Sequence, residues 1–400
     1  MLRRPLTCCH SLGEPAMARI LIKGLGLIFS GDIAQPRLDA EAILIEGGKI
    51  AGLGRAKDFE ADTIIDAQGC AVMPGLIDNH VHPAFGDWTP RQNQLGFIEA
   101  MVHGGTTTLI SAGEVHLPGR PKDAVGVKAL AIAAQRCFAA FRPMGARVLA
   151  GAPVPERGFR ESDYQEMAAG GVTLLGEIGL GTLKEAGEVV ETMGWARKAG
   201  LNAMIHCGGP SIAGSNLMQA EVVIAADADI VAHINGGPTS LPAAELTKVI
   251  AGTKRAIEIV HNGNPRNAIH ALKVLTEMGR LDRLVLGTDS PAGSGVQPLG
   301  VMRTISLLCS LGGLDPAIAI AAAGGNTARW RNIQAGVIKP GAAADLVFLD
   351  APIGGAGRDA DEAFTFGELP GIGMVMVDGE VKTMRSRNTP PAARIPTVQA

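Results

Sequence analysis

Aromatic residues, charge of one sign and long hydrophobic runs are all scarce in this sequence. Phe, Trp and Tyr make up 4% of the 400 residues, and the formal net charge is only −3. Proteins that bind nucleic acid usually carry a basic face and aromatic side chains on which bases stack, so we expect no nucleic-acid partner. No apolar run reaches the roughly 18 residues of a membrane span, and no signal-peptide pattern is visible. We therefore expect a cytoplasmic protein with no membrane partner.

Paired cysteine motifs are also missing. The six cysteines lie at positions 8, 9, 70, 137, 207 and 309, and no two of them form a C-x-x-C pair. This spacing predicts no disulfide framework and is typical of a reducing compartment. Cys207 follows His206 directly, and we expect it to be a small buried thiol rather than a reactive one.

Short β-like runs bounded by glycine or proline occur near both ends of the chain. They lie at residues 19–26, 42–48, 49–54, 63–66, 336–338, 344–350 and 373–380. Closely spaced short strands are typical of an all-β unit. We predict one β-sandwich built from residues 18–73 and 335–387, a loose tail at 1–17, and a C-terminal tail at 388–400. The C-terminal tail either is loose or lies over a neighbouring subunit.

Between these two parts, at residues 74–334, strand-like apolar runs alternate with helix-like segments. Eight such runs lie at 76–82, 106–112, 146–152, 172–179, 202–209, 229–236, 256–263 and 283–290. Alternating β and α segments predict a parallel sheet covered by helices, and eight repeats match an α/β fold of the (β/α)8, or TIM, barrel type. An open doubly wound sheet is the alternative, but no G-x-G-x-x-G motif follows the first run.

The barrel prediction directs attention to the residues that end its strands, because active sites of such barrels lie at the C-terminal strand ends. The first strand ends in His80 and His82, which point to the same face because they are two residues apart. Four later strands end in, or carry near their ends, a carboxylate or an imidazole: Glu177, His206, His233 and Asp289. Each residue alone has a structural explanation, but together they predict one transition-metal site.

This arrangement resembles the amidohydrolase superfamily of metal-dependent hydrolases, in which a His-x-His ends strand one, histidines follow strands five and six, and an Asp follows strand eight. The likeness extends from about Ala18 to Arg387. Four further segments, SAGEVHLPGRPKDA, GEIGLGT, HINGGPTS and SRNTPPA, are similar to the enamidase branch of that superfamily. The resemblance implies a barrel inserted into a β-sandwich and a homo-oligomer, most simply a tetramer.

The resemblance also implies two metal ions and their ligands. One ion would be held by His80, His82, Glu177 and Asp289, and the other by Glu177, His206 and His233. The implied metals are zinc and iron, or two zinc ions, bridged by Glu177 and a hydroxide.

Two departures from commoner superfamily patterns favour this branch. Many binuclear members bridge their metals with a carboxylated lysine on strand four, whereas Glu177 occupies that strand here, which disfavours a dihydroorotase or a hydantoinase. Mononuclear deaminases usually carry a glutamate three residues after the strand-five histidine. Here Cys207, Gly208 and Gly209 follow His206, which disfavours a deaminase.

The predicted reaction is hydrolysis of the C–N bond of a cyclic amide. Two divalent cations lower the pKa of a shared water from about 15.7 to about 7, so a hydroxide is available to attack the carbonyl. Asp289 would take the proton from the water and pass it to the leaving nitrogen, which makes Glu177 and Asp289 the predicted catalytic residues. The enamidase resemblance implies 6-oxo-1,4,5,6-tetrahydronicotinate as substrate, with ring opening, loss of ammonia and formation of 2-formylglutarate.

Four residues are predicted to bind this small-molecule substrate. Arg120, on a Gly- and Pro-rich loop, is suited to grip a carboxylate, and His116 to donate to the same group or to the oxyanion. Asn235 precedes two glycines that let the backbone approach a ligand, and His261 ends strand seven. Arg120 has an equally good interpretation as a structural arginine, and His261 as a packing residue.

Two alternatives to an enamidase-type enzyme stay open. The first is an amidohydrolase that acts on another lactam, a carbamate or an ester. The second is a non-enzymatic metal-binding scaffold, which we expect to have lost a ligand, and none of the six is missing.

Overall fold

The structure is a computed structural model that describes residues 18–83, 90–113, 119–210, 215–237, 239–291 and 295–399. Within the first helix of the barrel, side chains are described from Gly96 onward. The predictions for residues 1–17 and for His116 lie outside the described residues.

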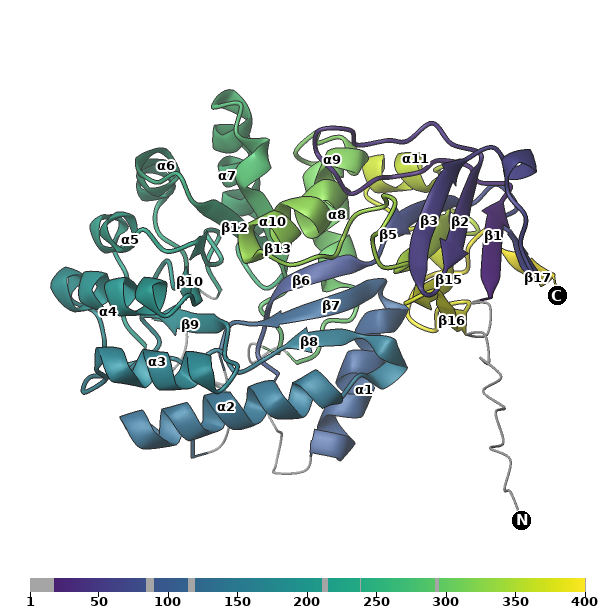
Figure 1. The fold of residues 1–400 in the computed structure, drawn as a ribbon. Helices are drawn as coiled ribbons and strands as arrows, with labels where there is room; N and C mark the ends of the chain where they lie inside the picture. The colour runs from purple at the N-terminus through teal and green to yellow at the C-terminus, as the bar shows by residue number, and fades with distance from the viewer. Residues whose placement is uncertain are drawn as a thin grey trace, which may run out of the picture.

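Within the described residues, eight parallel strands form the barrel (Figure 1). They are β6 (Leu76–Val81), β7 (Thr106–Ser111), β8 (Arg147–Leu149), β9 (Leu174–Ile178), β10 (Asn202–Ile205), β11 (Ile230–Val231), β12 (Ala256–Val260) and β13 (Leu284–Gly287). Strands β6–β8 and β9–β13 form two runs of hydrogen-bonded neighbours. The Asp289 N–H donates to the His80 carbonyl at 2.9 Å and joins β13 to β6, while the Gly176 N–H donates to Pro153 at 2.9 Å and joins β9 to the end of β8. The predicted (β/α)8 barrel is confirmed.

Each barrel strand is followed by a helix, as the alternation in the sequence predicts. These helices are α1 (Pro90–His103), α2 (Ala124–Ala140), α3 (Glu161–Ala169), α4 (Ala186–Lys198), α5 (Ala220–Ala226), α6 (Ala243–Gly252), α7 (Pro265–Glu277) and α8 (Gly300–Ser310). Helix α7 shows why they form: the Asn264 side chain accepts from the N–H groups of Arg266 and Asn267, and Pro265 occupies the first helical position. Among the described residues, none of the helices is long and apolar enough to cross a membrane.

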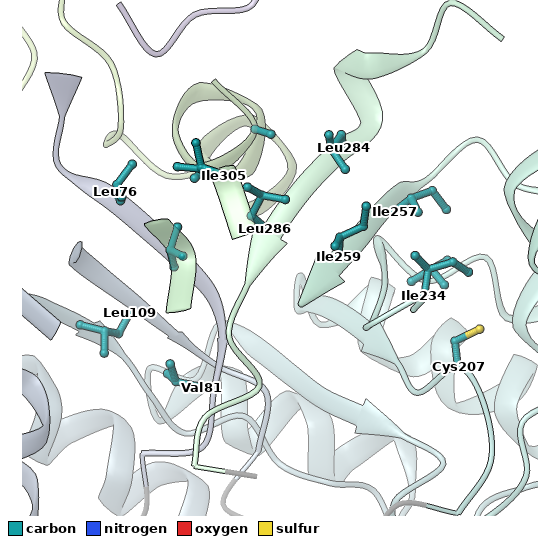
Figure 2. Close-up of a cluster of buried hydrophobic side chains, with 14 of the residues drawn as sticks. Leu76, Val81, Leu109, Cys207, Ile234, Ile257, Ile259, Leu284, Leu286 and Ile305 are labelled. Atoms are coloured by element: carbon teal, nitrogen blue, oxygen red, sulfur yellow. The ribbon is translucent and has the colours of Figure 1, made fainter. Parts of the chain in front are cut away.

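The main hydrophobic core lies between the barrel strands and their helices. Figure 2 shows part of this core, a buried cluster that contains Ile305 of α8, Leu284 and Leu286 of β13, and Ile257 and Ile259 of β12. The inside of the barrel holds separate apolar clusters, in which Met204, Ile230 and Val285 pack with smaller residues. Because each strand is covered on both faces, the strands consist of nearly continuous apolar runs.

A second unit is built from both ends of the chain, and its two sheets lie beside the barrel (Figure 1). One sheet has the order β17-β4-β1-β2-β3, and the other has the order β16-β15-β14-β5. Their strands are β1 (Arg19–Lys23), β2 (Ala42–Glu46), β3 (Lys49–Gly54), β4 (Thr63–Asp66), β5 (Ala71–Pro74), β14 (Leu346–Asp350), β15 (Gly371–Val377), β16 (Glu380–Met384) and β17 (Thr397–Gln399). Ile43 and Ile65 of one sheet share a buried cluster with Phe348 and Met374 of the other.

The end of the C-terminal tail differs from the loose segment that the sequence suggests. Strand β17 pairs antiparallel with β4, with Val398 opposite Ile65. Upstream of it, Arg394 forms an ion pair with the buried carboxylate of Asp350, with 2.6 Å between Nε and Oδ2. The tail is ordered because the edge of β4 offers free backbone groups and Asp350 needs a counter-charge.

The remaining helices of the described residues are short. They include α11 (Ala360–Thr365), 3₁₀ turns at Ala56–Asp58, Pro143–Gly145 and Leu281–Arg283, and the segments after α8. The segments α9 (Pro316–Ala321), a π-helical turn (Ala322–Asn326) and α10 (Thr327–Arg331) follow α8. Helix α10 lies at the N-terminal ends of the barrel strands, since Asn202 at the start of β10 donates to the Trp330 carbonyl at 2.8 Å. Arg331 therefore enters the barrel from the end opposite to the predicted site.

Candidate metal centre

The six predicted ligands converge at the C-terminal end of the barrel. Glu177 lies at their centre, and its Oε1 is 2.6 Å from His233 Nε2 and 3.7 Å from His206 Nδ1. Its Oε2 is 3.5 Å from His80 Nε2 and 4.0 Å from His82 Nε2. The two carboxylate oxygens of Glu177 thus face two different pairs of histidines.

Asp289 completes the side of the site that contains the His-x-His motif. Its Oδ1 lies 3.2 Å from His82 Nε2 and 3.6 Å from His80 Nε2. All six ligand side chains are buried, and the most exposed of these residues, Asp289, shows 6% of its surface. The site is therefore largely desolvated, so that electrostatic interactions within it are strong.

Hydrogen bonds fix which nitrogen three of the histidines present to the centre. His80 Nδ1 lies 2.8 Å from Glu258 Oε2, and His82 Nδ1 lies 2.8 Å from the Gly113 carbonyl. His206 Nε2 lies 2.9 Å from the Gly209 carbonyl. Because these acceptors require an N–H, the opposite ring nitrogen of each neutral imidazole carries a lone pair that points to the centre.

The charges around His80 favour a cation in this pocket. Burial alone would lower the pKa of His80, but the carboxylates of Glu258, Glu177 and Asp289 raise it well above its usual value. Burial would likewise raise the pKa of Glu177, yet His80 and His233 hold it well below its usual value. Both shifts favour positive charge where the histidine nitrogens meet the carboxylates.

Two ligands sit in backbone conformations that few residues adopt. Asp289 has a φ of 57° and His233 a φ of 26°. The strained turn at Asp289 is held from both sides, because its N–H donates to His80 and its carbonyl accepts from Asn262 Nδ2 at 2.8 Å. Such strain is maintained where the surrounding structure needs a side chain in one direction, here into the pocket.

These residues fit a pair of divalent transition-metal ions. The ligand atoms of His80, Glu177 and His233 lie within 4.8 Å of one another, and so do those of His80, His82 and Asp289. In the described part of the chain, the buried Nε2 of His80, which faces the centre, has no hydrogen-bond partner. Imidazole nitrogens with carboxylate oxygens are suitable ligands for zinc and for iron.

The predicted substrate-binding residues are placed less favourably than the ligands. Arg120 Nη1 lies 3.3 Å from Oε1 of the buried Glu156, so its charge already has a partner. The Asn235 amide donates to the Val260 carbonyl and accepts from the Val260 N–H, each at 2.9 Å, and extends strand pairing. This buried side chain therefore supports the loop that follows β11.

His261 directly follows β12 and lies next to the start of α8. A Cβ at Gly300, the first residue of α8, would lie 3.3 Å from the Cβ of His261. Burial and the charge of Arg303 lower the pKa of His261. The position favours packing over substrate binding. Cys207 is fully buried among apolar side chains (Figure 2), and burial raises the pKa of its thiol to about 12, as expected for an unreactive cysteine.

Several buried polar residues around the centre are not among the residues predicted from the sequence. Glu258 and Asn79 interrupt the apolar runs of β12 and β6, and a charged or amide residue within a buried strand is a signal that sequence reasoning can use. Asp78 accepts from the Thr288 hydroxyl at 2.6 Å and ties the two strands that close the barrel. Arg331 carries no comparable signal, because it lies in a short helix outside the predicted strands.

Gly287 lies at the end of β13, and because it has no side chain, His80 can pack directly against it. A Cβ at this position would lie 2.7 Å from the Cβ of His80 and 3.1 Å from Glu258 Oε1. We expect Gly287→Ala to displace His80, to lower the free energy of unfolding by about 1–3 kcal/mol, and to reduce the metal content of the purified protein. Denaturant unfolding and elemental analysis measure both effects.

The matched control is Gly194→Ala, in the middle of α4, where a new Cβ meets nothing within 4 Å. This change should leave the metal content unaltered and stabilise the protein by up to about 1 kcal/mol. A Gly287→Ala protein with native stability and native metal content would contradict the tight fit of His80.

Comparisons with known proteins point to the same chemistry as the geometry. The amidohydrolase family model matches residues 71–382. The enamidase of Eubacterium barkeri is 44% identical over 381 residues, which cover 94% of this chain and 99% of the enamidase. A crystal structure of enamidase matches with a TM-score of 0.91 and 43% identity, over 96% of this chain and 100% of that chain. The structure of molinate hydrolase shares the fold, with a TM-score of 0.64, 18% identity, and coverage of 92% and 95%.

Proposed function

The chain belongs to the amidohydrolase family, and from that membership and the geometry of its site we propose that it is an enamidase-type hydrolase of a cyclic amide. The proposed substrate is 6-oxo-1,4,5,6-tetrahydronicotinate, whose ring opening and loss of ammonia give 2-formylglutarate. The observation that carries the proposal is the convergence of four imidazoles and two carboxylates in a protein that is 44% identical to an enamidase over nearly its whole length.

We propose that the six ligands hold two divalent metal ions, zinc and iron or two zinc ions. His80, His82 and Asp289 would hold one ion, His206 and His233 the other, and Glu177 would contribute one oxygen to each. Such a pair of ions, when bound, lowers the pKa of a shared water towards about 7 and polarises the amide carbonyl. The division is supported by the two faces of Glu177, since its Oε1 meets His233 and His206 while its Oε2 meets His80 and His82.

The protein's own groups would then move the proton. Asp289 is the proposed general base and acid, because its carboxylate borders the pocket and is held there by its hydrogen-bonded, left-handed backbone. The Asp289 pKa lies below its usual value, since His80, His82 and His233 together outweigh the effect of burial. An ionised carboxylate is the state that can accept a proton from the attacking water and deliver it to the leaving nitrogen.

Arg120 is the proposed site for the substrate carboxylate. Its side chain is 11% exposed, and among the described residues its contact with Glu156 leaves several of its five N–H donors available. We expect Arg120→Ala to raise KM by about 10- to 100-fold, as for the loss of a charge-assisted hydrogen bond of about 1.5–3 kcal/mol, with a smaller change in kcat. The control is Arg157→Ala, on the loop after β8, whose guanidinium pairs with Glu188.

The test is an assay of ammonia release from 6-oxo-1,4,5,6-tetrahydronicotinate and from the same ring without its carboxylate. The proposal predicts that the carboxylate-bearing ring is hydrolysed with the higher kcat/KM, and that Arg120→Ala removes this preference. If kcat/KM is equal for the two rings and is unchanged in Arg120→Ala, Arg120 does not bind the substrate carboxylate. Hydrolysis of carbamates or esters without ring opening of either lactam would favour the alternative amidohydrolase.

The remaining proposals concern the state of the protein in the cell. We propose a cytoplasmic homo-oligomer, a tetramer, on the basis of the enamidase resemblance. The free thiols of Cys70, Cys137, Cys207 and Cys309 are compatible with a reducing compartment. Light scattering on the purified protein tests the assembly.

A further inference from the structure

Glu258 is a buried carboxylate for which the proposed reaction has no use. It lies in the middle of β12, in the apolar run AIEIV, and is fully buried. An ionised carboxylate is costly to bury without partners. Three N–H donors converge on the carboxylate: His80 Nδ1, the His233 backbone N–H and Asn79 Nδ2. The strand therefore places a charge at this position, and its contacts indicate why.

One oxygen of Glu258 contacts a ligand of each proposed metal ion. Its Oε2 accepts from His80 Nδ1 at 2.8 Å and from the backbone N–H of His233 at 2.9 Å. The first contact fixes the tautomer of His80, and the second helps hold the unusual backbone conformation of His233, whose φ is 26°. A single carboxylate thus orients ligands from β6 and from the end of β11.

The other oxygen connects the centre to a buried arginine. Glu258 Oε1 accepts from Asn79 Nδ2 at 2.5 Å, and Asn79 Oδ1 accepts from Arg331 Nε at 2.5 Å. The Arg331 Nη2 also donates to the Asn79 carbonyl at 3.2 Å. Because arginine has no acceptor, the Asn79 amide has only one orientation that satisfies both neighbours.

Arg331 supplies a counter-charge without direct contact. It is 4% exposed, and burial lowers the pKa of its guanidinium to about 10, partly offset by attraction to Glu258 and Asp229. It stays protonated at neutral pH. Arg331 therefore donates to Asn79, Asn79 donates to Glu258, and Glu258 accepts from His80 and His233.

We propose that Glu258 is the positioning residue of the metal centre: with Asn79 and Arg331 it forms a buried relay that fixes the ligands of both metal ions. This inference rests on the proposed binuclear function. It goes beyond it by assigning a role to three residues that lie outside the ligand set and cross the barrel interior from α10 to the site. Removing the hydrogen-bond partner of a metal-binding histidine typically lowers the affinity for the metal by about 10- to 100-fold.

The first test is Glu258→Gln, which keeps the size of the side chain. Its single carbonyl oxygen must accept from His80 and His233, so its amide N–H2 then faces the N–H2 of Asn79. Asn79 cannot turn over, because Arg331 donates to its Oδ1. If the glutamine turns instead, its amide faces the Nδ1–H of His80. Either orientation leaves two donors in contact, and we expect zinc to be released to a chelator about 10- to 100-fold faster than from the native protein.

The second test is a rescue by the double variant Asn79→Asp/Glu258→Gln. The glutamine amide then donates to one aspartate oxygen, and Arg331 donates to the other. His80 and His233 again face an acceptor, so every donor has a partner. We expect zinc release to slow by about tenfold relative to Glu258→Gln, whereas Asn79→Asp alone places two carboxylates in contact and should be less stable than the native protein. A merely structural role for Glu258 predicts no such rescue.

Two further proteins complete the design. Glu258→Asp keeps the charge but withdraws the oxygens by about 1.5 Å, so zinc release should still accelerate, and it serves if Glu258→Gln does not fold. Asp163→Asn, a buried aspartate of α3 that pairs with Lys128, is the control and should release zinc at the native rate.

The outcomes separate this inference from the proposed function. A native protein that takes up no metal overturns the proposed function and this inference with it. A native protein with two bound ions, from which Glu258→Gln and Glu258→Asp release zinc at the native rate, overturns the positioning role alone. A double variant that releases zinc as fast as Glu258→Gln also overturns it.

Discussion

Glu177→Ala is expected to leave a protein that holds at most one divalent cation per chain and has almost no hydrolytic activity. Glu177 contacts both pairs of histidines, with 2.6 Å between its Oε1 and His233 Nε2 and 3.5 Å between its Oε2 and His80 Nε2. Alanine removes both carboxylate oxygens and one negative charge from the buried site. We expect kcat/KM to fall on the order of 10⁴-fold or more, as when one member of a catalytic unit is removed.

The measurement combines steady-state kinetics with elemental analysis of the same preparation. Asp350→Ala is the matched control, because Asp350 is also fully buried but lies in β14 and pairs with Arg394. The control should lose stability and keep both its metal ions and its kcat. A Glu177→Ala protein with two ions and activity within tenfold of the native value would contradict the bridging role.

Asp289→Asn is expected to lower kcat by about 10²- to 10⁴-fold, the usual contribution of a positioned acid or base. The substitution keeps the shape of the side chain but removes a group that can accept a proton. Asparagine tolerates a positive φ better than most residues, so the backbone at φ 57° should be preserved. The loss should therefore be chemical rather than conformational, and it should exceed the change in KM.

Kinetics at neutral pH together with a thermal unfolding curve test this expectation. Asp229→Asn is a suitable control, since Asp229 accepts from the Ala203 N–H near the opposite end of the barrel strands and pairs with Arg255. It should change stability without a comparable loss of kcat. If Asp289→Asn retains both ions and turns over within a few-fold of the native rate, Asp289 does not transfer the proton.

The sequence was sufficient to predict the barrel and the place where the six candidate ligands meet, for a local reason. A buried parallel strand consists of a short apolar run in the sequence. In a (β/α)8 barrel the active site lies at the C-terminal ends of these strands. His80 and His82 end β6, and Asp289 follows β13, so both positions can be read from neighbouring residues. Even β11, which contains only Ile230–Val231, was found because DIVAHING repeats the pattern of an apolar run before a histidine.

The interactions behind the ligands could not be predicted in the same way. The contact between Arg331 and Asn79 joins residues 252 positions apart, and nothing local pairs them. The strand pattern also fails at Asn79 and His80, which are adjacent yet both reach Glu258, because the register of β6 against β7 shifts between Asp78 and Val81. Alternation predicts opposite directions for such neighbours.

The substrate side was the least accessible to sequence reasoning. The charge of Arg120 and its Gly- and Pro-rich loop predict a substrate-binding role, but its pairing with Glu156 depends on how the loop after β8 folds back. Asn235 and His261 follow strands and therefore looked available to a ligand. Whether such a residue faces the pocket or a helix depends on the exact end of the strand, which a single sequence defines poorly.

The most direct test of the central claim is the metal content of the purified protein, measured by elemental mass spectrometry alongside its activity. We predict two divalent cations per chain, loss of hydrolysis when a chelator removes them, and recovery when zinc or iron is restored. A preparation that opens the lactam ring at its full rate with no bound cation would contradict the account.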